Sequence, residues 1–382
     1  MSDDNVELIA TAAFGLEAVV SRELEQLGYA DRTVADGRVT FRAGLAAICR
    51  TNLWLRSADR VLLKVGEFDA TDFGELFDRT IELPWADWLP ADAAFPVRGK
   101  TVRSALHSTP HCQSIVKKAI VESLRRDHRR DELPETGDTF PIEVALLRDR
   151  ATLTIDTSGV GLHKRGYRTM AGPAPLKETL AAALVQLSFW NAERPLIDPL
   201  CGSGTIPIEA ALIGRNRAPG VDRHFAAEQW PWLPARLWDE AHAEAADLRT
   251  DGEPLRIIGS DIDERVLGLA RQHAQVAGVE RDVHLQVADV SEVSSRRKYG
   301  CVITNPPYGE RLGDRDQAES VYRKIAELMP ALDTWSLYVL TAHPRFEQIV
   351  GRRSDRRRKL YNGRLECTYY QMHGPRPPRR DG

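Results

Sequence analysis

The sequence predicts an α/β protein in two parts: an α+β segment up to about residue 160, then a mainly parallel sheet with helices on both faces. Two observations support this prediction. After residue 160, short apolar runs alternate with segments of helical periodicity, which is the pattern of repeated β–α units. Near the C-terminus, Asn362–Gly363 separates two strand-like runs and predicts an antiparallel hairpin that ends the sheet.

The first part mixes short strands and helices. Helices are predicted at 16–28, in the first half of 44–68 and at Ile115–Arg126, which is basic and amphipathic. Strands are predicted at 37–43, in the second half of 44–68, at 95–106, and twice within 140–158 around a tight turn at Arg148–Asp149. This part offers no recognisable pairing of a nucleophile with a base, so we expect a binding module.

The second part repeats a strand followed by a helix. A long helix, Leu176–Trp190, precedes the repeats. The predicted strands are 195–198, 256–261, 283–289, 301–305 and 336–342, and the predicted helices are 205–213, 264–277, 317–328 and 345–350. Residues 227–248 form an insertion between the first and second of these strands.

Composition favours a globular protein of the reducing cytosol. The five cysteines are scattered without a C-x-x-C pair or a Cys/His cluster, which favours free thiols and argues against zinc. The longest mainly apolar run, 180–190, is too short to span a bilayer, and the N-terminus lacks a signal-peptide pattern. We therefore expect a cytoplasmic protein with no membrane segment and no metal.

Two basic stretches, 116–130 and 345–382, can contact nucleic-acid phosphates, although either can equally be solvated surface.

The predicted strands of the second part end in polar residues or run into a glycine loop. In a parallel sheet, ligands bind beyond the carboxyl ends of the strands. The first strand runs into Asp198 and a glycine loop, and the next three end at Asp261, Asp289 and Asn305. A nicotinamide cofactor is disfavoured, because the third glycine of its fingerprint is missing and Asp261 lies too far along the chain. Asp261 suits a ribose diol and Asp289 an adenine amino group, with helix capping as the alternative for each.

The stretch Asn305–Pro306–Pro307–Tyr308 follows the fourth strand. The prolines stiffen the backbone, so that the Asn305 side-chain oxygen and the Pro306 carbonyl can both accept hydrogen bonds from one NH₂ group. Such a pair of acceptors activates an exocyclic amine of a base, while Tyr308 can stack on that base. A sulfonium methyl group held at the glycine loop would be the electrophile. The alternative is a rigid turn with a half-buried tyrosine.

Several stretches together resemble the THUMP-domain class I RNA methyltransferases, a branch formerly labelled as N6-adenine-specific DNA methylases. They are LHKRGYR, APLKETLAAAL, DPLCGSGTIPIEAALIGRNRAPG, SDIDERV, NPPYGERLG and DTWSLYVLT. The resemblance covers nearly the whole chain. It implies a Rossmann-like methyltransferase sheet at 159–382, a ferredoxin-like segment at 1–50 and an RNA-binding THUMP domain at 51–158.

The resemblance also implies roles for individual residues. Asn305, Pro306, Pro307 and Tyr308 match the catalytic tetrapeptide. The cofactor S-adenosylmethionine (SAM) would contact Asp198, Cys201, Gly202, Ser203, Gly204 and Thr205 with its methionine part, Asp261 with its ribose, and Ile262, Asp289 and Val290 with its adenine, beside Asn305. Lys164, Arg165, Arg168, Lys177 and Glu178 match positions that line the cofactor cleft.

The implied activity is methylation of the N2 amine of guanine in large-subunit (23S) ribosomal RNA, with that RNA or the assembling subunit as partner. The same tetrapeptide supports a second reading, methylation of adenine N6 in DNA or RNA, because both targets are exocyclic amines. A third reading is a non-catalytic RNA-binding factor of ribosome assembly, against which the intact glycine loop and tetrapeptide count. A base inside a helix cannot reach such a site, so the target must be unpaired or flipped out.

Overall fold

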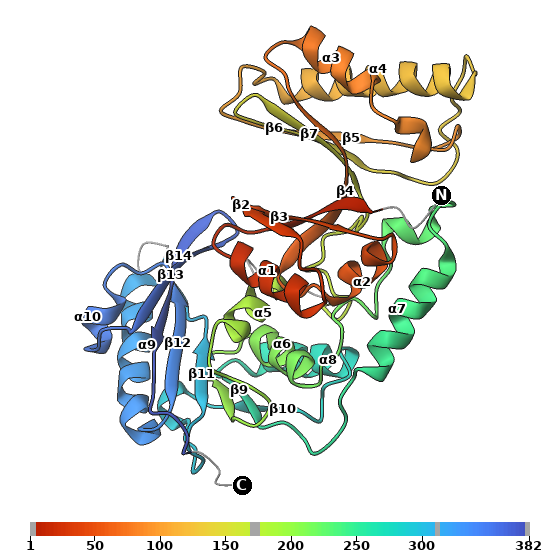
Figure 1. The fold of residues 1–382 in the computed structure, drawn as a ribbon. Coiled ribbons are helices and arrows are strands. Elements are labelled where there is room, and N and C mark those ends of the chain that lie inside the picture. The colour runs from red at the N-terminus through yellow and green to blue at the C-terminus, as the bar shows by residue number, and fades with distance from the viewer. Residues whose placement is uncertain (1–4, 169–175, 310–313, 379–382) are drawn as a thin grey trace.

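The computed structural model describes residues 5–168, 176–309 and 314–378 and contains two seven-stranded sheets (Figure 1). The first sheet has the order β2-β3-β1-β4-β7-β6-β5, and the second has the order β10-β9-β8-β11-β12-β14-β13. The predicted combination of an α+β part and a mainly parallel sheet with a C-terminal hairpin is confirmed. Parts of two stretches quoted above, at 169–175 and 310–313, lie outside the described residues.

The first sheet consists of two halves that share one long strand. Its strands are β1 (Val6–Ala12), β2 (Arg32–Ala35), β3 (Arg38–Ala43), β4 (Ala58–Asp69), β5 (Val97–Val102), β6 (Ile142–Leu147) and β7 (Arg150–Asp156). The beginning of β4 pairs with β1 and its end pairs with β7, with a register shift between Lys64 and Gly66. The half with β5, β6 and β7 therefore projects from the rest of the molecule as a separate module (Figure 1).

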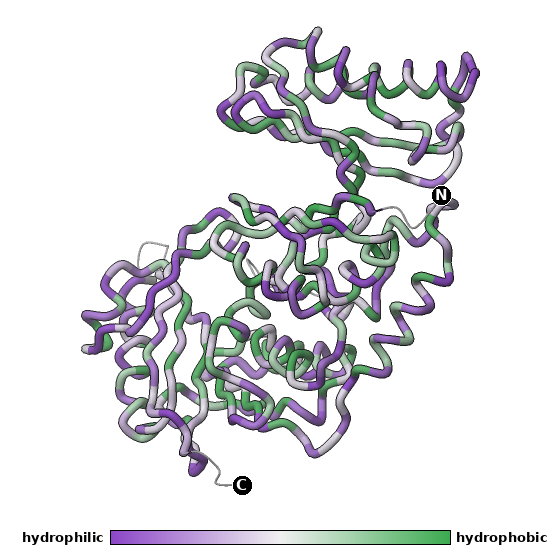
Figure 2. The backbone as a smooth tube through the Cα atoms, viewed as in Figure 1, coloured by the Kyte–Doolittle hydropathy of each residue, from purple (hydrophilic) through white to green (hydrophobic). Residues whose placement is uncertain are grey.

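Each half carries its own helices. Helices α1 (Glu17–Gln26) and α2 (Ala46–Trp54) belong to the half that lies against the second sheet. Helices α3 (Phe73–Ile81) and α4 (Thr109–His128) cover one face of β5, β6 and β7 in the projecting module (Figure 1). The C-terminal end of α4 is hydrophilic (Figure 2).

The second sheet follows the predicted β–α repeats. Its parallel strands are β8 (Leu196–Asp198), β9 (Ile257–Asp261), β10 (Val283–Val287), β11 (Cys301–Thr304) and β12 (Ser336–Thr341), and the hairpin is β13 (Arg356–Asn362) with β14 (Leu365–Met372). The helices are α5 (Glu178–Gln186), α6 (Thr205–Gly214), α8 (Glu264–Val276), α9 (Asp314–Leu328) and α10 (Phe346–Val350), while α7 (Ala235–Asp247) lies in the insertion after β8. Strand β14 is antiparallel to β12, so the hairpin ends the sheet as predicted.

The largest buried cluster extends through both parts of the chain. It includes Leu53 of α2, Leu184 of α5, Leu212 of α6 and Leu196 of β8. The first half-sheet and the second sheet therefore share apolar surface, and we expect them to move as one unit.

None of the described helices combines the length and hydropathy needed to cross a bilayer. All five cysteines are buried, and Cys49, Cys112, Cys201 and Cys301 are free thiols, as expected.

Candidate functional site

The parallel register of the second sheet brings the ends of its strands to one edge. Asp198 at the end of β8 is paired with Gly259 of β9, so Asp261 lies two residues further along the same edge. Val302 of β11 is paired with Ile197, and the Thr304 hydroxyl donates a 2.7 Å hydrogen bond to Asp198 Oδ1. Asn305 follows immediately, so the predicted residues Asp198, Asp261 and Asn305 lie at one edge of the sheet.

Asp198 is buried beneath this edge, with 1% of its surface exposed. Burial raises the pKa of its carboxyl group to about 7, although hydrogen bonds from Thr304 and the Leu200 N–H act in the opposite direction. Asp198 therefore titrates near neutral pH.

The glycine loop after β8 is fixed by backbone hydrogen bonds to β9. The Cys201 N–H donates to the Ser260 carbonyl (2.9 Å), and the Gly202 N–H donates to Asp261 Oδ2 (3.0 Å). Gly202 and Gly204 have φ angles of 51° and 81°, which glycine adopts without strain. Space around Gly202 is open, whereas a side chain at Gly204 would come within 3.1 Å of Ala270. Ser203 contributes its carbonyl oxygen, which lies 3.2 Å from His273 Nδ1.

Helix α6 begins at this loop, and Thr205 in its first turn joins a buried charge pair. Arg168 donates a 2.6 Å hydrogen bond to Thr205 Oγ1 and lies 3.4 Å from Glu178 Oε1. Arg168 Nε and Glu178 Oε2 are buried and have no hydrogen-bond partner among the described residues. Burial raises the pKa of Glu178. These two predicted cleft residues therefore flank the start of α6.

The other three predicted cleft residues lie apart from Thr205. Arg165 is buried and pairs with Glu209 at 3.5 Å. Lys164 is exposed, and Lys177 lies 3.8 Å from Asp59 of the N-terminal half. The structure thus pairs Arg165 with a residue of α6 one turn beyond Thr205, and Lys177 with the N-terminal half.

The acid at the end of β9 and its neighbour differ sharply in exposure. Both carboxylate oxygens of Asp261 accept backbone hydrogen bonds, one from Gly202 and one from Asp263 (3.0 Å). Ile262 is 68% exposed, an unusual position for a large aliphatic side chain. Asp263, and not Asp261, caps helix α8. The capping alternative for Asp261 is therefore absent, and Ile262 offers apolar surface at the site.

Asp289 does cap a helix. Its carboxylate accepts bonds from the Ser291 N–H (3.0 Å) and hydroxyl (2.6 Å), and it pairs with Lys324 at 2.6 Å. The bond from Lys324 lowers the pKa of Asp289 to about 2. Val290 beside it is 2% exposed. Asp289 thus combines the capping role with its place at the sheet edge.

The tetrapeptide after β11 is held by hydroxyl groups. Tyr308 is half-buried, and its hydroxyl donates to Asn305 Oδ1 and accepts from Asn362 Nδ2 (3.3 Å). The Tyr322 hydroxyl donates to the Pro307 carbonyl at 2.8 Å. Pro306 is buried, and no described residue donates to its carbonyl oxygen.

Comparison with protein families identifies each part of the chain. Residues 165–371 match the RMKL-like methyltransferase domain, residues 7–62 the RlmL ferredoxin-like domain, and residues 70–156 the THUMP domain. The chain belongs to the RMKL-like methyltransferase family.

Other members of the RMKL-like methyltransferase family match over almost the full length. The Bacillus subtilis protein named "Putative RNA methyltransferase YpsC" is 46% identical over 98% of this chain and 97% of its own. A Listeria monocytogenes structure described as "a predicted N6-adenine-specific DNA methylase" is 51% identical, with a TM-score of 0.93 and 97% of each chain covered. The structure of SMU.472, "a putative methyltransferase complexed with SAH", is 45% identical, with a TM-score of 0.93, and covers 99% of this chain and 100% of that one.

Three residues of the candidate site are indicated by no pattern in the sequence. Thr304 bonds to Asp198, Asn362 reaches Tyr308 from the hairpin, and His273 contacts the Ser203 carbonyl. Asn362 lies in the Asn-Gly pattern, but that pattern predicts only the turn and not the contact with Tyr308. The contact of His273 joins residues 70 positions apart, and no local pattern predicts it. The described residues contain no group of three or more His, Cys, Asp or Glu side chains arranged to hold a metal ion.

Proposed function

We propose that this protein transfers the methyl group of SAM to the N2 amine of a guanine in RNA, in the large-subunit (23S) ribosomal RNA. The observation that carries the proposal is the sheet edge where Asn305 and Pro306 follow β11, beside β8 and its glycine loop, and where no described residue donates to the Pro306 carbonyl. The THUMP match and the relative named as an RNA methyltransferase support RNA as the substrate. We propose the domain division 1–50, 51–158 and 159–382.

The residues at the sheet edge fit SAM. The open space at Gly202 admits the methionine part, and the first N–H groups of α6 suit its carboxylate. Glu178 Oε2, which has no hydrogen-bond partner among the described residues, offers an acceptor for an ammonium group. We assign Asp198 and Cys201–Thr205 to the methionine part and Asp261 to the ribose hydroxyls. The exposed face of Ile262 would pack on the adenine, with Asp289 and Val290 at its edge.

Bound SAM supplies an electrophilic methyl group. The chain's own groups prepare the nucleophile, because a base amine is a poor nucleophile while its lone pair is delocalised into the ring. Asn305 Oδ1 already accepts from Tyr308, but a carbonyl oxygen has a second lone pair for the amine. Together with the Pro306 carbonyl it would draw the two amine protons out of the ring plane and stabilise the transition state.

Two experiments test the proposal. The protein is incubated with unmethylated ribosomal RNA and labelled SAM, and the RNA is digested to nucleosides. Label in N2-methylguanosine is the expected result. Methylated guanines are then mapped in ribosomal RNA from cells with and without the gene, where one position should lose its modification.

Adenine N6 is the second candidate target, favoured by the description of the Listeria relative and by the shared chemistry of exocyclic amines. Label in N6-methyladenosine and none in N2-methylguanosine would establish it. Absence of SAM binding in calorimetry would instead favour the third candidate function, a non-catalytic RNA-binding factor.

A further inference from the structure

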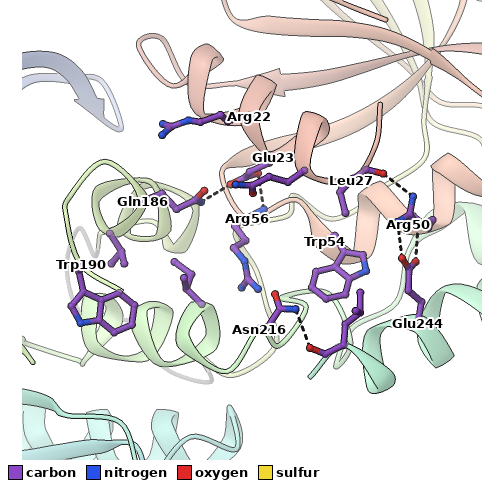
Figure 3. Close-up of a pocket in the computed structure, with 14 residues that line it drawn as sticks. Arg22, Glu23, Leu27, Arg50, Trp54, Arg56, Gln186, Trp190, Asn216 and Glu244 are labelled. Carbon is purple, nitrogen blue, oxygen red and sulfur yellow. Dashed lines mark hydrogen bonds and ion pairs between the residues drawn. The ribbon is translucent and has the colours of Figure 1, made fainter. Parts of the chain in front are cut away.

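A cavity of about 440 Å³ lies between the N-terminal half-sheet and the methyltransferase domain (Figure 3). Helices α1 and α2 line one side of it, and α5, α6 and α7 line the other. Its lining includes Gln186 and Ile213, near the C-terminal ends of α5 and α6. Helix α6 begins at the glycine loop and is ten residues long, so its two ends lie about 15 Å apart. The cavity is therefore distinct from the candidate functional site.

Arg56 is the unusual residue of this cavity. Only 8% of its surface is exposed, and Nη1 is buried with no hydrogen-bond partner in the part of the chain that the structure describes. No described residue accepts a hydrogen bond from, or forms an ion pair with, its guanidinium group. Figure 3 shows the side chain extending from the level of Glu23 toward Asn216. Burial lowers the pKa of Arg56 to about 10, so the group is still a cation at neutral pH.

The carboxylates that line the cavity already accept hydrogen bonds from other groups. Glu23 accepts four hydrogen bonds: from the N–H groups of Arg56 and Ser57, the Ser57 hydroxyl and Gln186 Nε2. Glu244 accepts two 2.6 Å bonds from Arg50. The guanidinium of Arg56 thus has no hydrogen bond or ion pair with a carboxylate among the described residues, and the charges of Glu209 and Glu23 offset its burial only at longer range.

A second donor and several apolar groups complete the cavity. The indole N–H of Trp54 is buried and has no partner among the described residues. Trp190, Ile213 and Leu248 supply apolar lining. A ligand that carries an anionic group, a second hydrogen-bond acceptor and an apolar body would satisfy all three features.

We propose that this cavity binds a small oxyanion, the carboxylate or phosphate group of a small molecule, through the guanidinium of Arg56. The planar fork of arginine matches both anions. Because Arg56 is so deeply buried, a terminal anionic group can reach it, whereas a phosphodiester flanked by riboses on both sides cannot. The inference goes beyond the proposed methyl transfer and does not depend on it.

Thermal unfolding of the full chain tests the proposal. The unfolding midpoint is measured against increasing sodium phosphate, sodium acetate or sodium chloride at equal ionic strength and pH. We expect a saturable rise with phosphate, acetate or both that chloride does not give, because a ligand that binds only the folded state stabilises it. A response to phosphate alone identifies a phosphate site, and a response to acetate alone a carboxylate site. No rise beyond that in chloride would overturn the proposal.

Three variants locate the response. Arg56→Met keeps the length of the side chain without its charge, and the apparent affinity for the anion should fall at least about tenfold. Trp54→Phe removes only the indole donor and should weaken binding less. Arg281→Gln, an exposed arginine outside the cavity, should respond like the unaltered protein.

An equal response in Arg56→Met would overturn the proposal. If that variant fails to fold, Arg56→Lys decides, because it keeps the charge and loses the planar fork, and an unchanged affinity in it overturns the proposal too. S-adenosylhomocysteine should bind every variant equally, so a failure of the anion site can be told apart from a failure of the proposed function.

Discussion

Tyr308 and Asn305 are bound to each other at the end of β11. The tyrosine hydroxyl bonds to Asn305 and to Asn362 of the hairpin, so two strands far apart in sequence fix its ring. The ring is half-buried, and under the proposed function its accessible part would stack on the target base. Tyr308 thus orients Asn305, whose second lone pair would accept from the amine in the proposed reaction.

Asn305→Ala should lower turnover by about 10²–10³-fold, because it removes a preorganised acceptor used in the transition state. The affinity for S-adenosylhomocysteine should change little. Methyl-transfer kinetics and calorimetry measure the two effects. Asn362→Ala is the matched control, since it removes a contact with the Tyr308 hydroxyl and leaves the acceptor in place. A parallel loss of turnover and cofactor affinity in Asn305→Ala would contradict the role.

Asp261→Ala should act first on cofactor binding. It removes the proposed ribose acceptor and frees the Gly202 N–H, so the dissociation constant should rise about 10- to 100-fold. Asp263→Ala is the control, because that residue caps α8. It should cost about 1 kcal/mol of stability without a comparable change in affinity. Similar affinities in the two variants would exclude a ribose contact by Asp261.

Asp198 should make stability depend on pH. Burial raises its pKa from 3.8 to about 7, so the folded state binds more protons than the unfolded state between these values. Its contribution is full below the lower value and is lost as the pH rises through 7. Relative to Asp198→Asn, the unfolding free energy should fall by at most about 4 kcal/mol between pH 4 and 8.

Chemical denaturation at a series of pH values measures this difference. Thr304→Val removes a hydrogen bond that lowers the pKa of Asp198, so the fall should move to higher pH. Parallel pH profiles for the unaltered protein and Asp198→Asn would show that the carboxyl group is not perturbed.

At the scale of elements, the sequence predicts strands β8–β12 within one or two residues. Each is a short run with apolar residues that has a polar residue at its end or within two residues of it, so the sequence indicates both the strand and its boundary. The turn at Arg148–Asp149 is also predicted, and both residues have positive φ angles. Strand β2 and helix α3 are not predicted, because the exposed strand has few apolar residues and only Leu76 and Thr80 of the helix are buried.

The hairpin is predicted correctly, but its centre differs from an Asn-Gly turn. Asn362 is the last residue of β13 and pairs with Leu365, which leaves Gly363 and Arg364 as the turn. Gly363 has a φ angle of 64°. The Asn362 side chain is thereby free to reach Tyr308. Contacts of this kind, like that between Asp289 and Lys324, depend on how distant elements pack, which local patterns do not contain.

The start of α6 provides a test at this scale. Gly204→Ala should cost about 1–2 kcal/mol through its φ angle of 81°, and the crowding against Ala270 should displace the loop and weaken cofactor binding. Gly278→Ala, with a φ angle of 64° and only the flexible Arg217 nearby, is the matched control. It should lose similar stability and keep its affinity. Equal affinities would mean that the loop does not hold the cofactor.

At the scale of the whole molecule, the THUMP module stands away from the second sheet (Figure 1). Strand β4 joins the module to the N-terminal half-sheet, and Trp230 of the insertion stacks on its Phe140. We therefore expect that mutations can change RNA binding by the module without changing methyl transfer at the sheet edge. The basic segment 116–130 is only partly free to bind phosphates. Lys117 pairs with Glu135 and Arg126 with Asp127, whereas Arg125, Arg129 and Arg130 are exposed and have no ion pair among the described residues.

Replacing Arg125, Arg129 and Arg130 by glutamine should weaken RNA binding and reduce its salt dependence by about 0.7 in slope for each phosphate that the module no longer neutralises. Turnover at saturating RNA should persist, because the sheet edge around Asn305 is unaltered. Filter binding across a salt series and methyl-transfer kinetics provide the two measurements. Arg281→Gln, an exposed arginine of the methyltransferase domain, is the control for general loss of charge. The module does not bind RNA independently of the methyltransferase domain if Arg281→Gln changes the salt slope of RNA binding as much per lost charge as the triple variant does. Loss of turnover at saturating RNA in the triple variant would also contradict independent binding.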